Sequence, residues 1–262
     1  MNEKFLFVEN ALLPHVVTHR IDADWAHFSV WSDIHQGLNC RWLLQKAIQT
    51  VLNIKNYYIW IGGDSTNSNT KNSKGIITEE WASGDKQIIT LAEDLKPLYD
   101  AGRILGISRG NHTDRVYNDT YIVPEIMLAC LLGNKELYKG HIGLLYFNVK
   151  KNLYIHYITH KNFKQKDYYD FVAADYIWRE HFHAMEARPK LILEHNRIVK
   201  KPIVKRVWDI QNGSFQVLPE YAKANGYKFL LPGYYVANMN GDDQNRIAGL
   251  CSDDDFTNFK FE

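Results

Sequence analysis

The first half of the chain alternates short apolar runs with amphipathic stretches of helical period. The apolar runs predict strands at 27–35, 57–64 and 104–112. Apolar spacing predicts helices at 40–52 and 85–100, and an opening Pro with a closing Gly predicts a third at 124–133. Strands that alternate with helices of this length favour parallel pairing in βαβ units.

From about residue 141 to residue 216 the pattern changes, and most of the chain is expected to form strands. These strands are predicted at 141–149, 153–160, 174–183, 190–195 and 202–210. No linker rich in Pro, Gly or Ser separates the two halves, so we predict a single domain, 1–262, of two packed sheets flanked by helices. The polar insert 65–84 is expected to be a surface loop beside the end of the second strand.

Composition narrows the class of protein. Among 262 residues, 45% are hydrophobic and 13% aromatic, which suffices for a sizeable core. Thirty-one basic residues nearly balance 30 acidic ones, which argues against a protein that grips nucleic acid mainly through a field of positive charge. The cysteines, Cys40, Cys130 and Cys251, are separated and odd in number, which suits free thiols in a reducing compartment. We find no signal peptide and no apolar run near the ~20 residues of a membrane span, so we expect a soluble, cytoplasmic protein without a membrane partner.

Polar side chains that can bind metals follow the predicted strands. They are Asp33 and His35, Asp64, Asn111 and His112, His160, and His181 and His183. Ligands in open α/β sheets sit at the carboxyl ends of the strands, so we expect these groups to converge. Oxygen and imidazole donors without thiolate favour Mn, Fe, Zn, Co or Ni. Each piece alone also has an ordinary structural explanation, such as a turn, a helix cap or a hydrogen-bonded core histidine.

The spacing of His181 and His183 adds to this expectation. In extended backbone, side chains two residues apart point to the same side, so both imidazoles could reach one object. A pair of metals also needs a bridging oxygen ligand, which a carboxylate can supply.

The order of these blocks resembles the calcineurin-like metallophosphoesterase superfamily, whose pattern is D-x-H, G-D, G-N-H-[D/E], H and G-H-x-H. This chain has DIH at 33–35, GD at 63–64, GNHT at 110–113, His160 and EHFH at 180–183. The segment 213–227 is also similar to that of small bacteriophage-encoded members. The resemblance implies a four-layer α/β/β/α sandwich of two mixed β-sheets flanked by helices, with a dinuclear metal site at strand ends, and host cytoplasm as the location if the chain is phage-encoded.

Carried over by position, the resemblance implies one metal held by Asp33, His35 and His183. A second metal would be held by Asn111, His160 and His181, with Asp64 bridging the two. His112, with Asn111, would bind the phosphate, and His112 would protonate the leaving oxygen. The expected cofactors are two divalent metal ions, with Mn the first choice. Thr113 stands where the family has Asp or Glu, and Glu180 where it has Gly, which would require a ligand loop that accepts a side chain.

The resemblance implies hydrolysis of phosphate esters by metal-activated water. A phosphodiesterase acting on nucleic acid or a nucleotide is our first hypothesis. A phosphomonoesterase, or a non-catalytic metal-binding scaffold of the same fold, are the alternatives, and the oligomeric state is left open. The basic strip 197–206 could follow a phosphate backbone or form a solvated strand edge. We find no G-x-S-x-G, P-loop or dinucleotide fingerprint, which weakens the case for acyl transfer, NTP binding and hydride transfer.

Overall fold

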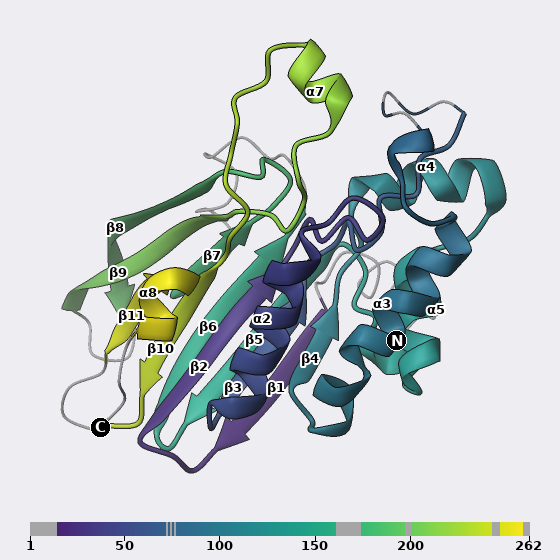
Figure 1. Ribbon diagram of the computed structural model, residues 1–262. Helices are drawn as coiled ribbons and strands as arrows, with labels where there is room; N and C mark the ends of the chain where they lie inside the picture. The colour runs from purple at the N-terminus through teal and green to yellow at the C-terminus, as the bar shows by residue number, and fades with distance from the viewer. Residues whose placement is uncertain are drawn as a thin grey trace, which may run out of the picture.

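Two mixed β-sheets pack face to face, and described helices cover the outer face of the five-stranded sheet (Figure 1). This computed structural model describes residues 15–71, 73, 75, 77–160, 174–196, 201–242 and 247–258. The predicted α/β class with two mixed sheets and flanking helices is confirmed. That 1–262 form one domain stays a prediction.

The five-stranded sheet carries the parallel strands of the first half of the chain. Its order is β11 (Ala248–Ser252), β10 (Tyr235–Asn240), β2 (Trp25–Trp31), β3 (Tyr57–Ile61) and β4 (Ile104–Ile107). β2, β3 and β4 are parallel, as the βαβ pattern predicts. β10 joins β2 antiparallel, and β11 extends that edge.

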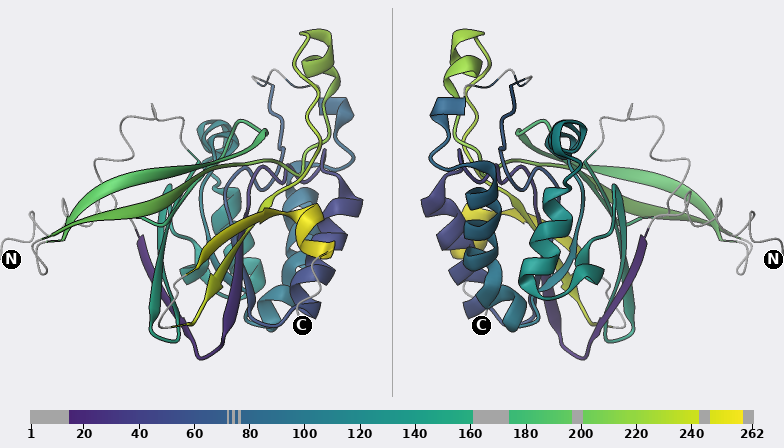
Figure 2. Two further views of the ribbon diagram at one scale, coloured as in Figure 1. Left: turned by 90° about the vertical axis from the view of Figure 1, so that its left-hand side faces the viewer. Right: turned by 90° about the vertical axis from the view of Figure 1, so that its right-hand side faces the viewer.

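The six-stranded sheet contains the strands predicted for the second half of the chain. Its order is β1 (His15–Ile21), β5 (Ile142–Val149), β6 (Asn152–Thr159), β7 (Tyr176–Arg179), β9 (Lys201–Asn212) and β8 (Met185–Asn196). The pattern did not predict β1, which precedes β2 in the chain but pairs in parallel with β5 in the other sheet. β8 and β9 form a long hairpin that extends away from the helices (Figure 2).

The longer helices are α2 (Arg41–Asn53), α3 (Gly84–Asp100), α4 (Asn111–Thr120) and α5 (Pro124–Leu132). The predicted helices at 40–52, 85–100 and 124–133 are present as α2, α3 and α5, whereas α4 was not predicted. Shorter turns are η1 (Ile77–Glu79), η2 (Lys135–Leu137), α7 (Glu220–Ala224) and α8 (Asp253–Asn258). α5 begins at its Pro and is followed by Gly133 with a φ of 100°, the left-handed C-terminal cap that favours glycine. Within the described residues, no helix is long and apolar enough to cross a membrane.

Large aromatic side chains fill the space between the two sheets. Trp60 from β3, Trp178 from β7 and Phe147 from β5 are fully buried there. A separate cluster, which includes Leu44 of α2 and Leu91 of α3, packs the helices onto the five-stranded sheet. Burial of apolar area stabilises the folded state by roughly 25 cal/mol per Å². These two clusters therefore hold the strands, and the residues that follow their ends, in place.

The structure corrects three local predictions. The predicted strand 104–112 ends at Ile107, and Asn111 is the first residue of α4. The insert 65–84 is not all surface loop, because residues 65–68 are buried. β7 ends at Arg179, before the two histidines that were expected in extended backbone.

The basic strip 197–206 is described only in part. Arg197 and Lys200 lie outside the described residues. Lys205 Nζ lies 3.2 Å from a carboxylate oxygen of Asp175, so this lysine is engaged in an ion pair. Contact with a phosphate backbone therefore remains a prediction for the strip.

Candidate metal centre

The strand ends of both sheets converge on one group of side chains. Asp33 and His35 follow β2, Asp64 follows β3, and Asn111 opens α4 after β4. In the six-stranded sheet, β6 and β7 are parallel neighbours. His160 follows β6, and His181 and His183 follow β7. Ligand-binding groups are expected at the carboxyl ends of parallel strands, and here two sheets contribute them to the same end of the molecule. α4 and α7 rise at this end (Figure 1).

Asp33, His35 and His183 form the first cluster. Their candidate ligand atoms all lie within 4.8 Å of one another. Asp33 Oδ1 is 3.1 Å from His183 Nε2, 3.8 Å from His35 Nε2 and 3.7 Å from His160 Nε2. These are the residues that the resemblance implies for one metal, and the structure brings them together.

Asp64, His160 and His181 form the second cluster, again with their candidate ligand atoms within 4.8 Å. His160 Nε2 is 3.0 Å from Asp64 Oδ2 and 3.2 Å from Asn111 Oδ1. Asp64 also lies within the same limit of His35 and His112. It therefore sits between the two clusters, where a bridging carboxylate belongs.

Hydrogen bonds to the outer ring nitrogens turn His35 and His160 toward the centre. His160 Nδ1 is 3.1 Å from the carbonyl of Gly62 and 3.1 Å from Glu180 Oε2. His35 Nδ1 is 3.1 Å from Asn67 Oδ1. These partners are acceptors, so each Nδ1 carries a hydrogen and each Nε2 is the ring nitrogen that faces the centre, where a metal would displace any proton that it carries. His35 Nε2 is buried without a hydrogen bond from the described part of the chain.

Unusual backbone conformations concentrate at these residues. Nine described non-glycine residues have a positive φ, and five of them are candidate ligands: Asp33 (50°), His35 (48°), Asp64 (45°), His181 (85°) and His183 (56°). Left-handed backbone costs energy for residues with a Cβ, and such strain clusters at functional sites. The expectation that His181 and His183 converge because of extended backbone is therefore wrong in its cause. A left-handed loop after β7 directs them to the two clusters.

Close contact between two loops holds Asp64. A Cβ on Gly110 would lie 2.0 Å from Asp64 Oδ1, so only glycine permits this approach. The backbone N–H of His112 donates to the same oxygen at 2.7 Å. The glycines of the GD and GN motifs thus have a packing role beside the ligands.

Negative charge is concentrated in the buried centre. Burial alone would raise the pKa of Asp33, but His160 and His183 hold it well below its ordinary value. Burial likewise opposes ionisation of Asp64, and His160 and His112 lower its pKa. Burial disfavours the charged form of His160, yet Asp64 and Asp33 raise its pKa well above the ordinary value. Two ionised carboxylates that attract positive charge, surrounded by inward imidazole nitrogens, fit divalent cations of borderline character.

His112 has a defined tautomer at the edge of the centre. Its Nδ1 lies 3.0 Å from the carbonyl oxygen of Asn67, so Nδ1 donates and Nε2 points inward. Nε2 is 4.0 Å from Asp64 Oδ2. Burial lowers the pKa of His112 to about 3, against the opposing effect of Asp64. The neutral ring thus offers a lone pair toward the centre.

The residues that orient the histidines were not identified from the sequence. Asn67 lies in the insert expected at the surface, and its side-chain amide donates to Glu80 Oε1 at 2.6 Å, which leaves Oδ1 for His35. Glu180 was noticed only as a departure from the family motif; it is not among the residues with positive φ, so it imposes no backbone strain. No signal in the polar run at 65–71 distinguishes Asn67 from its neighbours.

The departure at Thr113 is also explained by packing. Thr113 Oγ1 donates to Glu125 Oε2 of α5 at 2.6 Å, and Ser65 Oγ donates to Glu125 Oε1 at 3.2 Å. Asp114 pairs with Arg109 at 2.6 Å instead of turning toward the centre. A buried carboxylate from α5 therefore links the Asp64 loop to the first turn of α4.

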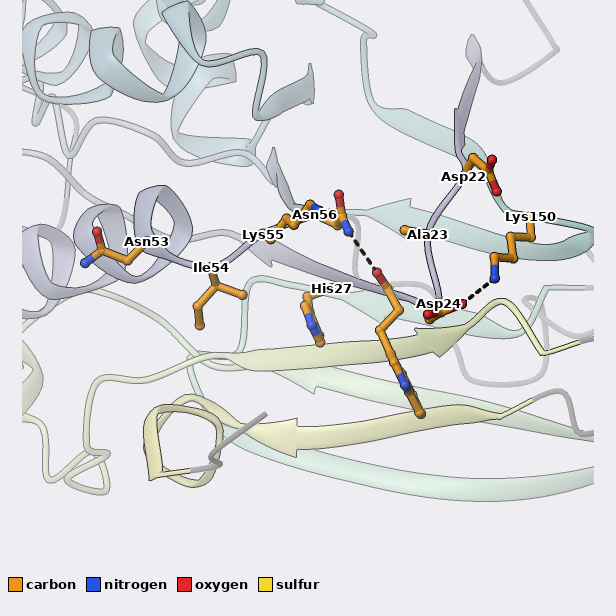
Figure 3. Close-up of a pocket in the computed structure, with 10 residues that line it drawn as sticks. Asp22, Ala23, Asp24, His27, Asn53, Ile54, Lys55, Asn56 and Lys150 are labelled. Carbon is orange, nitrogen blue, oxygen red and sulfur yellow. Dashed lines mark hydrogen bonds and ion pairs between the residues drawn. The ribbon is translucent and has the colours of Figure 1, made fainter. Parts of the chain in front are cut away.

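A larger hollow lies at the opposite end of the five-stranded sheet (Figure 3). It has a volume of about 850 Å³ and is lined by residues from the start of β2 and the end of α2. Among its lining residues Lys150 pairs with Asp24, and His27 Nδ1 is 2.7 Å from Asn238 Oδ1. None of the three candidate metal-ligand clusters among the described residues includes a residue that lines this hollow.

No protein-family model and no curated protein sequence matches the chain. Among solved structures, it is similar to Vps29 from Entamoeba histolytica complexed with Zn²⁺ (9% identity, 86% of this chain and 98% of that chain, TM-score 0.42). It is also similar to a metallophosphoesterase from Sphaerobacter thermophilus (13% identity, 86% and 87%, TM-score 0.41). A third is the NAD nucleotidase of Haemophilus influenzae (10% identity, TM-score 0.44), where the match covers 88% of this chain and 51% of that one. These similarities are weak, so the functional argument depends on the site.

Proposed function

We propose that this chain is a dinuclear, metal-dependent phosphoesterase of the calcineurin-like type. The observation that supports the proposal is the pair of His and Asp clusters, with Asp64 between them and the Nε2 atoms of His35 and His160 turned inward. Asp33, His35 and His183 would hold one metal; Asn111, His160 and His181 would hold the other, with Asp64 shared. Metals bound in this way lower the pKa of a water molecule and neutralise charge on phosphate oxygens.

His112 is proposed to bind the phosphate with Asn111 and to deliver a proton to the leaving oxygen. Its Nδ1–H donates to the Asn67 carbonyl, so Nε2 faces the candidate metal ligands, where it would meet a phosphate bound by the metals. The ring is neutral before substrate binds, because burial lowers its pKa. An anionic phosphate beside Nε2 would raise that pKa and so favour the protonated form.

Phosphodiesters of nucleic acids or nucleotides are the proposed substrates. Phe182 separates the two histidines of the β7 loop and is 42% exposed, with its ring centroid 5.5 Å from that of His181. An exposed aromatic ring beside the reacting phosphate suits the stacking of a base. The side chain of His183 is 30% exposed, so the first cluster can be reached from the surface.

The experiment that tests this function compares a diester with a monoester. Metal-stripped protein is supplied with Mn²⁺ and assayed on bis-p-nitrophenyl phosphate and p-nitrophenyl phosphate, beside a His112→Ala variant. We expect a metal-dependent rate that is higher on the diester and falls by about 10²–10⁴-fold in the variant. A preference for the monoester would favour a phosphomonoesterase. No rate with two metals bound would favour a non-catalytic scaffold, for which the loss of a carboxylate at position 113 is the motivating observation.

A further inference from the structure

Glu180 is a buried carboxylate placed directly against a candidate ligand. It follows the last residue of β7 and is 1% exposed. Glu180 Oε2 lies 3.1 Å from His160 Nδ1, on the side of the ring away from the centre. Glu180 stands where the G-H-x-H pattern has glycine, so that pattern does not predict this contact.

Glu180 packs against Gly62, the residue directly after β3, which leaves room for the carboxylate because it has no side chain. A Cβ on Gly62 would be 2.2 Å from Glu180 Oε1 and 2.6 Å from its carboxyl carbon. The carbonyl of the same Gly62 is the second acceptor for His160 Nδ1, at 3.1 Å. Gly62 and Glu180 thus form one matched cradle around the outer nitrogen of His160.

The cradle determines what His160 offers to the centre. With two acceptors at Nδ1, that atom keeps its hydrogen and Nε2 faces Asp64 and Asn111, so Nε2 is the nitrogen available to a metal. A carboxylate behind a histidine ligand also makes the imidazole a stronger donor to a metal.

We propose that Glu180 is a positioning residue: it orients His160 and strengthens metal binding at the second cluster, not at the first. This inference rests on the proposed dinuclear centre. His35 of the first cluster has the neutral Asn67 amide in the corresponding place. The two clusters therefore differ in the partner behind one histidine, and Glu180 should affect only one of them.

The test is a titration of metal-stripped protein with Mn²⁺ by calorimetry. The wild type is compared with Glu180→Gln, which keeps the shape, and Glu180→Gly, which removes the side chain. We expect two sites in the wild type, one of which weakens by about 10–100-fold in Glu180→Gly and by less in Glu180→Gln, since an amide oxygen can still accept from Nδ1. The other site should keep its affinity.

The matched control is Asp175→Asn, which alters another buried carboxylate at the opposite end of β7. Asp175 Oδ2 accepts from the backbone N–H of Ile155 at 2.8 Å, far along the strand from the candidate ligands. We expect both metal affinities to be unchanged in this variant. If Glu180→Gly weakens both sites equally, or neither, Glu180 does not position His160 and the inference is overturned. If the wild type binds fewer than two metals, the dinuclear centre itself fails, and the inference fails with it.

A second variant tests the cradle itself. Gly62→Ala should displace the Glu180 carboxylate and weaken the same site as Glu180→Gly does. In the double variant Gly62→Ala/Glu180→Gly the added methyl group has room, so the two losses should not add. Fully additive losses would show that the two residues act independently and would contradict the cradle.

Discussion

The buried carboxyl of Glu125 should make the stability of this protein depend on pH in a predictable direction. Burial raises the pKa of Glu125 from 4.5 to about 7, although Thr113 opposes this by donating to the carboxyl. Below about pH 4.5 the group is protonated in both the folded and the unfolded chain. Between pH 4.5 and 7 only the unfolded chain loses the proton, so the free energy of unfolding falls as the pH rises. A difference of about 2.5 pH units corresponds to about 3 kcal/mol.

Glu125→Gln removes the titration while it keeps an oxygen that can accept from Thr113. Relative to the wild type, the variant should therefore gain about 2.5 kcal/mol in free energy of unfolding between pH 5 and pH 8. The measurement is urea unfolding of both proteins in EDTA at the two pH values, so that other titrating groups cancel in the comparison. Asp114→Asn, which alters an exposed ion pair with Arg109, should change by less than about 1 kcal/mol. An equal gap between wild type and Glu125→Gln at pH 5 and pH 8 would show that Glu125 ionises normally in the folded protein.

Four further variants test the centre and the core. His183→Ala and His181→Ala should each lower the Mn²⁺ stoichiometry from two to one, since the two imidazoles belong to different clusters; loss of both metals in either variant would contradict the assignment. Phe182→Ala should raise KM for a dinucleotide by about 5–100-fold through lost stacking, with kcat nearly unchanged, and an unaltered KM would remove Phe182 from the substrate site. Gly143→Ala should lower the free energy of unfolding by about 1–3 kcal/mol, measured in urea, because its Cβ would lie 2.3 Å from the ring of Trp60; wild-type stability would mean that the two sheets can separate there.

Local sequence signals predicted the elements of the first half well because those signals depend on near neighbours. The apolar spacing of 40–52 and 85–100 matches α2 and α3 within a residue or so, and the Pro and Gly around 124–133 mark α5. The strands that precede Asp33 and Asp64 were also predicted, because their apolar runs are local signals. No strand was predicted at 15–21, where β1 lies, and the sequence of one strand does not show which of two sheets it joins.

The candidate site was predicted in its residues but not in its geometry. Asp33, His35, Asp64, Asn111, His160, His181 and His183 converge as expected. The cause assumed for His181 and His183 was wrong, since their backbone is left-handed rather than extended. Spacing in the sequence cannot reveal such a conformation, because it depends on the surrounding structure to hold an unfavourable φ.

The sequence by itself determined which donor atoms this protein has and that they follow strands, because residue type and local apolar period are properties of short segments. Only the tertiary structure decided how the side chains that carry those donor atoms are oriented. His160 meets Asp64 across 96 positions in the chain, and the backbone N–H of His181 reaches Asp33 across 148. Asn67 behind His35, Glu180 behind His160 and Glu125 beneath Thr113 are likewise brought in by packing. A hydrogen bond requires its two atoms within about 3 Å, and between residues this far apart only the packing of the two sheets and the helices brings them so close.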